Sequence, residues 1–260
     1  MEDPHSLLLE IAHCQIAKDI RSGSLRDHCC RTIVKSQTGL AFQLPEPWAG
    51  QIEHAPILFI SSNPSFDEEE EFPSDSVKDW PEARVVDFFK NRFTSPAGWV
   101  KNLGVLHRDG TYSRWVQFWA SARARTCELL RKNKDAVELG RDFALTEIVH
   151  CKSRGEVGVR EARAFCPKRY LDRVLFVSGA KILVVFGSKA QGAICDHLDV
   201  HDKKEMAELF GSARAIAGQR RMVAFLPHPN ARKVKKTLEA NLGSRRLADL
   251  RSYLEKGRQA

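Results

Sequence analysis

Short apolar runs that end in turn-forming residues recur along the chain. Residues 55–60 form one such run, and residues 143–149, 181–186 and 222–226 form three more. Runs of this length are typical of buried strands, and three of the four are followed by glycine, proline, serine or asparagine. The pattern therefore predicts four short strands.

Segments with helical spacing of apolar residues lie before, between and after these runs. They predict helices over 5–35, 80–93, 112–131, 160–177, 189–198 and 234–254, the last as one helix or a pair. Buried strands that alternate with helices indicate an α/β fold, here a three-layer α/β/α sandwich with a central, mainly parallel four-stranded sheet. We expect residues 1–260 to form a single domain, with an N-terminal helical segment and linker over 1–50 and a basic C-terminal helix over 237–260.

Three polar residues follow the predicted strands. Asn63, Glu147 and His228 each lie at or near the end of an apolar run. In parallel α/β sheets the site lies at the carboxyl ends of the strands. We therefore expect these three side chains to converge on one edge of the sheet. The acidic run Asp67–Glu71 nearby is expected to be a solvated surface loop.

Charge is unevenly distributed. The chain carries a net charge of +8, yet residues 211–260 alone hold 12 Lys and Arg against 3 Asp and Glu. A basic end on a near-neutral body is typical of a protein that binds a polyanion, and also of a solvated basic surface. No Walker-type or Gly-x-Gly-x-x-Gly loop is present, which argues against a nucleotide enzyme.

The sequence indicates a cytoplasmic protein with no membrane contact. No apolar stretch approaches the roughly 20 residues needed to cross a bilayer, and the acidic, polar start does not resemble a signal peptide. The seven cysteines of a cytoplasmic chain are expected to be buried thiols or metal ligands rather than disulfides. No protein partner is predicted.

Four segments together resemble the uracil-DNA glycosylase superfamily. Ile57–Ser65 (ILFISSNPS) is similar to its first motif, with Asn63 as in the mismatch-specific and single-strand-selective branches, and Leu226–Arg232 (LPHPNAR) is similar to its second. Thr146–Cys151 (TEIVHC) and Lys181–Gly187 (KILVVFG) resemble stretches of the iron–sulfur-containing fourth family. The order, separation and strand context of the four carry the resemblance.

The resemblance implies a monofunctional DNA glycosylase, which flips a base out of DNA and hydrolyses its N-glycosidic bond. Asn63 would position the attacking water, and His228 would donate a hydrogen bond to O2 of the departing pyrimidine. Ser62 and Phe66 would contact the base, with Phe66 stacking on it, although Phe72 is a rival for that role. An Asx-turn at Asn63, a structural loop histidine and a core phenylalanine remain the alternatives.

Two features depart from the motifs. Ser61 and Ser65 replace glycines, and Glu147 replaces the asparagine that reads uracil in the fourth family. An ionised glutamate only accepts hydrogen bonds, so it favours the 4-amino group of a cytosine-type base. A modified cytosine, such as the hydroxymethylated or glucosylated bases of phage DNA, is the predicted substrate, with an antiviral role. A Glu147 that is turned away, protonated or paired with a cation is the alternative.

The loop after His228 would enter the DNA. Arg232 could fill the gap left by the flipped base. The other residues expected to contact DNA are Ser65, Asn230, Lys233, Lys235 and Lys236, with Arg220 and Arg221 on the same face. A solvated start of a helix is the alternative.

Catalysis needs no cofactor, but the resemblance implies a structural [4Fe–4S] cluster. Cys151 and Cys166 match its later pair of ligands, and the earlier pair would come from the adjacent Cys29 and Cys30, with Cys14 as a substitute. Buried, reduced thiols are the alternative. For the whole protein, the alternatives are a uracil-DNA glycosylase of base-excision repair and a catalytically inactive DNA-binding module of the same fold.

Overall fold

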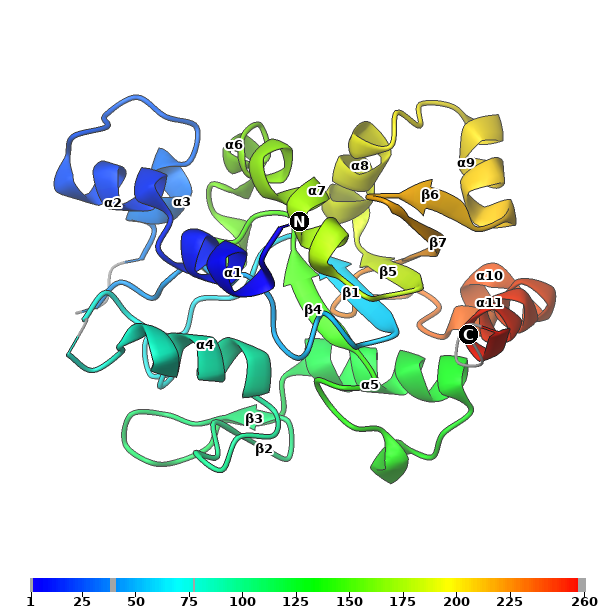
Figure 1. Ribbon diagram of the computed structural model, residues 1–260, viewed down its shortest axis with the longest axis horizontal. Coiled ribbons are helices and arrows are strands. Elements are labelled where there is room, and N and C mark those ends of the chain that lie inside the picture. The colour runs from blue at the N-terminus through cyan, green and yellow to red at the C-terminus, as the bar shows by residue number, and fades with distance from the viewer. Residues whose placement is uncertain (1, 38–40, 77, 257–260) are drawn as a thin grey trace.

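A computed structural model describes residues 2–37, 41–76 and 78–256, built around a five-stranded sheet (Figure 1). The strand order is β4-β1-β5-β7-β6, in which the first four strands run parallel and β6 pairs with β7 in the antiparallel sense. The strands are β1 (Ile57–Ser61), β4 (Ala144–Glu147), β5 (Ile182–Phe186), β6 (Arg214–Ile216) and β7 (Gln219–Leu226).

The central sheet has one strand more than the four predicted. The missing strand, β6, is a three-residue edge strand that returns through the turn at Ala217 and Gly218, both with positive φ. An edge strand exposes much of its surface, so β6 lacks the continuous apolar run that identifies the buried strands. The hairpin of β2 (Val100–Lys101) and β3 (Gly104–Val105) was not predicted either, because strands of two residues are too short to form an apolar run.

Successive side chains of the parallel strands face opposite layers. On β1, Leu58 and Ile60 pack into one buried cluster, whereas Ile57 and Phe59 pack into another. The first cluster includes residues of α1 (Pro4–Ala12), α7 (Cys166–Val177) and α8 (Ser188–His197), and the second includes α5 (Gln117–Leu130) and α11 (Ser244–Lys256). In Figure 1, α7 and α8 lie above the sheet and α5 lies below it. Helices on both faces form the predicted three layers.

Four of the predicted helices are shorter or divided. The helix expected over 5–35 is split into α1, α2 (Gln15–Ser22) and α3 (Arg31–Lys35). α1 is capped at His13, and α2 ends because Gly23 takes the left-handed conformation. The expected helix 112–131 begins only at Gln117. The remaining helices are α4 (Glu82–Asn91), α6 (Val159–Ala162), α9 (Lys203–Gly211) and α10 (Leu238–Leu242), with 3-10 turns η1 (Lys134–Ala136) and η2 (Arg154–Glu156).

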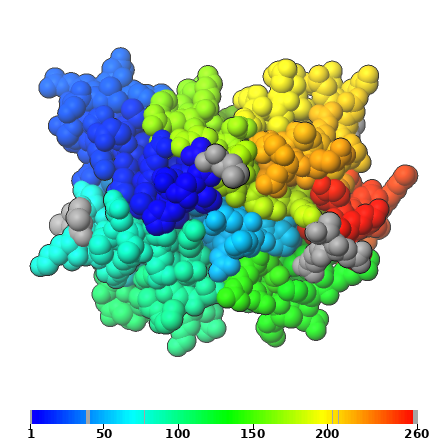
Figure 2. Space-filling model, viewed as in Figure 1, coloured from blue at the N-terminus to red at the C-terminus, as the bar shows by residue number. Residues whose placement is uncertain are grey.

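The C-terminal segment is a pair of helices joined at Gly243. It covers the end of α5, and the red and green segments meet in Figure 2. Arg251 Nε donates to the Glu128 carbonyl at 2.7 Å, and Glu128 Oε2 accepts from Leu238 N at 2.8 Å. Among the residues described, no helix is both long and apolar enough to cross a membrane.

Candidate active site

The carboxyl ends of three strands bring the predicted polar residues together. Asn63 lies two residues beyond β1, Glu147 is the last residue of β4, and His228 lies two residues beyond β7. All three line one cavity of about 370 Å³ at this edge of the sheet, which we call the Glu147 cavity. The predicted convergence is confirmed, and its cause is the parallel order of β4, β1, β5 and β7.

A second cavity, of about 460 Å³, adjoins the first. We call it the Glu156 cavity, and its walls include Ser62, Gly187 and Lys189. Four residues line both cavities: Asn63, Ser65, His228 and Asn230. Asn63 and His228 therefore stand at the boundary between two open spaces, rather than inside the core or on opposite sides of the molecule.

Internal hydrogen bonds orient the Asn63 amide. Its Nδ2 donates to the carbonyl of Pro64 at 2.9 Å, to Ser153 Oγ at 3.0 Å and to the Cys151 carbonyl at 3.5 Å. Because the nitrogen is committed to these acceptors, the side-chain oxygen is left to accept a hydrogen bond from the cavity side. Asn63 can thus hold a water molecule by accepting one of its protons.

The backbone sets the tautomer of His228. The Asn230 N–H donates to His228 Nδ1 at 3.2 Å, so the proton of the neutral imidazole lies on Nε2. Burial lowers the pKa of His228, while the nearby Glu156 carboxylate opposes the change. The ring lies nearly parallel to Phe118, with centroids 6.5 Å apart. His228 is a neutral N–H donor that faces the cavities.

Glu147 is buried and carries an unsatisfied oxygen. Ser61 Oγ donates weakly to Oε1 at 3.5 Å, and Oε2 has no hydrogen-bond partner within the described residues. Burial raises the pKa of Glu147 well above its usual range, and the Glu46 carboxylate adds to the effect. Arg92 and Lys152 oppose the shift, but its direction favours the protonated carboxyl, which was the alternative to an ionised Glu147. A neutral carboxyl group donates through O–H and accepts through C=O.

A buried ion network forms another wall of the Glu147 cavity. Arg92 pairs with Glu46 at 3.0 Å and with Glu70, and Lys152 pairs with Glu70 at 2.8 Å. Burial alone would raise the pKa of Glu70, but Lys152 and Arg92 lower it below its usual value. The prediction that the Asp67–Glu71 run is solvated was therefore wrong at Glu70, which is 4% exposed. No sequence pattern indicated this network, since its members come from distant segments.

The aromatic residues that line the Glu147 cavity do not include Phe66, which was predicted to stack on the base. Phe66 is buried and borders neither cavity, so its expected contact with a flipped base is not supported. Phe72 is a core residue that packs against Phe88 and Phe89. Phe118, at the start of α5, is the aromatic residue beside His228. It lies far from both motifs in sequence, so only the fold could identify it.

The Glu156 cavity contains charged residues that the motifs did not indicate. Ser62 Oγ and Lys189 Nζ both donate to the Glu156 carboxylate. Burial raises the pKa of Glu156, but these two hydrogen bonds outweigh it and bring the pKa below the usual value. The N-terminus of α8, which begins at Ser188, also opens into this cavity. Helix N-termini with a nearby lysine favour anions.

The predicted DNA-contacting loop is exposed beside the cavities. Ser65 and Asn230 line both of them, and the side chains that follow are exposed: Arg232, Lys233, Lys235 and Lys236. Arg220 and Arg221 do not belong to this face, contrary to the prediction. They lie at the opposite end of β7, where Arg221 is fully buried and donates to four backbone carbonyls.

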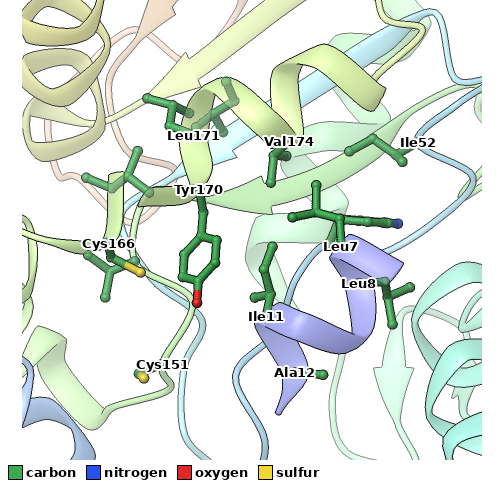
Figure 3. Close-up of a cluster of buried hydrophobic side chains, with 14 of the residues drawn as sticks. Leu7, Leu8, Ile11, Ala12, Ile52, Cys151, Cys166, Tyr170, Leu171 and Val174 are labelled. Atoms are coloured by element: carbon green, nitrogen blue, oxygen red, sulfur yellow. The ribbon is translucent and has the colours of Figure 1, made fainter. Parts of the chain in front are cut away.

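Five cysteines gather on the other side of the sheet from α5. Cys14, Cys30, Cys151 and Cys166 are buried in one cluster, with Cys29 partly buried against it. Figure 3 shows Cys166 and Cys151 near Tyr170, whose hydroxyl donates to Cys14 Sγ at 3.7 Å. Burial raises the pKa of Cys151, and the proximity of Cys166, Cys14 and Cys30 raises it further.

Four buried thiols in one place match the donor set of an iron–sulfur cluster. None of the seven cysteines forms a disulfide. The thiols of the adjacent Cys29 and Cys30 lie together with a ring nitrogen of His28, all within 4.8 Å of one another. Cys29 is partly exposed, whereas Cys14 is buried like Cys30, Cys151 and Cys166.

A scan against protein-family models finds no matching family, and a search of curated proteins finds no matching relative. The functional argument therefore depends on the site itself.

Proposed function

We propose that this protein is a monofunctional DNA glycosylase, of the uracil-DNA glycosylase type, that excises an abnormal or modified pyrimidine. One observation carries the proposal: Asn63 and His228 stand together between two adjoining cavities. The extruded base would enter the Glu147 cavity and the sugar would remain in the Glu156 cavity. The N-glycosidic bond would then cross the boundary where Asn63 and His228 lie.

The two boundary residues have complementary chemistry. As the bond breaks, negative charge develops on the base and positive charge on the sugar. The Nε2–H of neutral His228 would donate to O2 of the leaving base, where charge develops. The Asn63 oxygen would hold the water that attacks the sugar carbon. Asn63 cannot deprotonate that water, so its contribution is positioning.

A modified cytosine is the substrate that the Glu147 cavity favours. A neutral Glu147 would accept from the 4-amino group and donate to N3, which pairs both of its oxygens. About 370 Å³ leaves room for a substituent on the ring, and Asp67, Arg92 and Gln117 on the walls could bind its hydroxyl groups. Removal of such a base would serve defence against phage DNA, in the reducing cytoplasm.

Uracil is the second candidate, because the same neutral Glu147 could donate to O4 and accept from N3–H. An ionised carboxylate would have excluded that base. A uracil-specific enzyme would act in base-excision repair.

The exposed loop that follows His228 would bind the DNA. Arg232 would fill the space left by the flipped nucleotide, and the three lysines at 233, 235 and 236 would neutralise phosphates. A phosphate at the Glu156 cavity would face the α8 N-terminus.

We also propose a structural [4Fe–4S] cluster held by Cys14, Cys30, Cys151 and Cys166. It would take no part in hydrolysis, which needs no redox chemistry. Protein purified without oxygen should be brown, absorb near 400 nm and contain about four iron atoms per chain. Cys166→Ser should lose the iron, whereas Cys195→Ser, in α8, should retain it.

The excision activity is tested on oligonucleotides that each contain one test base. They are treated with the protein and then with alkali, which cleaves the strand where a base has been removed. The panel contains cytosine, uracil, 5-hydroxymethylcytosine and its glucosylated form. Cleavage at a modified cytosine supports the favoured substrate, and cleavage at uracil alone supports the repair alternative. Binding to every oligonucleotide without cleavage of any would identify an inactive DNA-binding module and contradict the proposal.

A further inference from the structure

Glu156 places a carboxylate in the Glu156 cavity, which Asn63 and His228 also line. It lines the same cavity as both of them, and its charge influences the pKa of His228. Gly155 and Glu156 both have left-handed backbone conformations, with φ of 58° and 59°. For a glutamate this conformation is unfavourable, so the surrounding structure must hold it. The strained turn directs the Glu156 side chain into the cavity.

Two donors fix the Glu156 carboxylate without removing it from solvent. Ser62 Oγ donates to Oε1 and Lys189 Nζ to Oε2, so each oxygen is held by a different element. The side chains of Glu156 and Lys189 remain 39% and 38% exposed. Ser62 is adjacent to Asn63, and Lys189 lies in the first turn of α8. The carboxylate is therefore ionised, oriented and accessible from the cavity.

Asn63 alone does not supply a proton acceptor or a negative charge for the reaction. Its amide can orient water but cannot take a proton, and it carries no charge to stabilise a sugar cation. Burial favours the neutral form of Glu147, and this residue lines the cavity assigned to the base. Of the described carboxylates, Glu156 is the one that lines the cavity assigned to the sugar.

We propose that Glu156 is a catalytic residue whose carboxylate faces the sugar cation, an inference that rests on the proposed glycosylase function. The C1′–N1 bond breaks with its electron pair passing to the base, which leaves positive charge on C1′ and O4′. The oxygen of the water held by Asn63 then bonds to C1′, and its proton passes to the Glu156 carboxylate. Glu156 returns this proton to solvent, and the base anion takes one up from solvent.

A surface ion pair is the competing explanation for Glu156. An exposed pair with Lys189 would contribute little to stability and would not require a strained turn beside Asn63. If the Glu156–Lys189 pair only blocked a phosphate site, the opposite kinetic result would be expected. Removal of the Glu156 charge would then strengthen DNA binding and raise the excision rate.

The experiment compares Glu156→Gln with Glu161→Gln, an exposed carboxylate of α6. Single-turnover excision is measured on the base that the wild-type protein releases, and DNA affinity on a matched oligonucleotide without that base. We expect Glu156→Gln to lower the rate by about 100-fold or more, with affinity unchanged or tighter. Glu161→Gln should match the wild-type protein in both.

A chemical rescue separates catalysis from a structural role. Formate should raise the excision rate of Glu156→Ala at least tenfold over the rate without formate, because it can supply the missing carboxylate. Formate should not raise the rate of Asn63→Ala. A Glu156→Gln rate within threefold of wild type, or a Glu156→Ala variant that is folded but unresponsive to formate, would overturn the inference while leaving the glycosylase intact. A wild-type protein that releases no base would overturn the proposed function and this inference with it.

Discussion

Gly187 stands directly against His228. A Cβ atom at Gly187 would lie 3.3 Å from the His228 Cβ, and the glycine has a φ of +82°. Gly187, which lies between the end of β5 and the start of α8, therefore also limits where the imidazole can lie. Any side chain here would push against the ring that borders both cavities.

Gly187→Ala should displace His228 and lower the excision rate by about tenfold or more. Gly243→Ala is the matched control, because its φ is +83° and nothing lies within 4 Å of the added Cβ. Both variants carry similar backbone strain, so melting temperatures should fall by similar amounts. Equal excision rates for the two variants would show that contact with His228 is unimportant.

Asn63→Ala and His228→Ala should each reduce single-turnover excision by about 100-fold or more, with DNA affinity retained. The reason is that both residues act on charges and water that matter only during bond cleavage. His54→Ala, an exposed histidine near the opposite end of β1, is the control and should keep full activity. Activity that survives both substitutions would exclude the proposed site.

Glu147→Gln should stabilise the protein near pH 7 by roughly 1–3 kcal/mol, because a neutral amide avoids the cost of burying a carboxyl group. The folded-state pKa of Glu147 is raised, so the wild-type protein loses stability as pH rises above the ordinary glutamate value. The gain should therefore vanish at acid pH, where the unfolded chain is also protonated. Urea unfolding at several pH values measures it, and the exposed Glu138→Gln should show no such trend.

The same carboxyl should make base selection depend on pH. Release of uracil requires the neutral form of Glu147 as donor, so its rate should fall as pH rises through the raised pKa. Release of a cytosine-type base should fall less, because an ionised Glu147 still accepts from the 4-amino group. Parallel profiles for the two bases would remove Glu147 from base recognition.

Alanine at Lys233, Lys235 and Lys236 should weaken DNA binding and flatten its salt dependence by about one unit for each lysine that neutralises a phosphate. The control is alanine at Arg131, Lys134 and Arg220, which removes the same charge. Arg131 and Lys134 follow the end of α5 that lies away from the Glu147 cavity, and Arg220 is the second residue of β7, at the opposite end of the sheet. A salt slope that changes equally in both triple variants would point to net charge alone.

The sequence by itself determined the four parallel strands, the layered α/β/α order and the edge where Asn63, Glu147 and His228 meet. These follow from local apolar runs and from the rule that parallel strands end on one side. It also indicated an exposed basic loop after His228, because consecutive charges remain hydrated wherever the chain lies.

Only the tertiary structure decided which side chains are buried and which meet. Phe66 turned inward while Phe118 took the place beside His228, and Arg221 became a core residue. The raised pKa of Glu147 depends on burial and on Glu46, which is distant in sequence. Glu156 reached the site through a strained turn. Solvation and charge proximity are properties of assembled segments, so no pattern within one segment could reveal them.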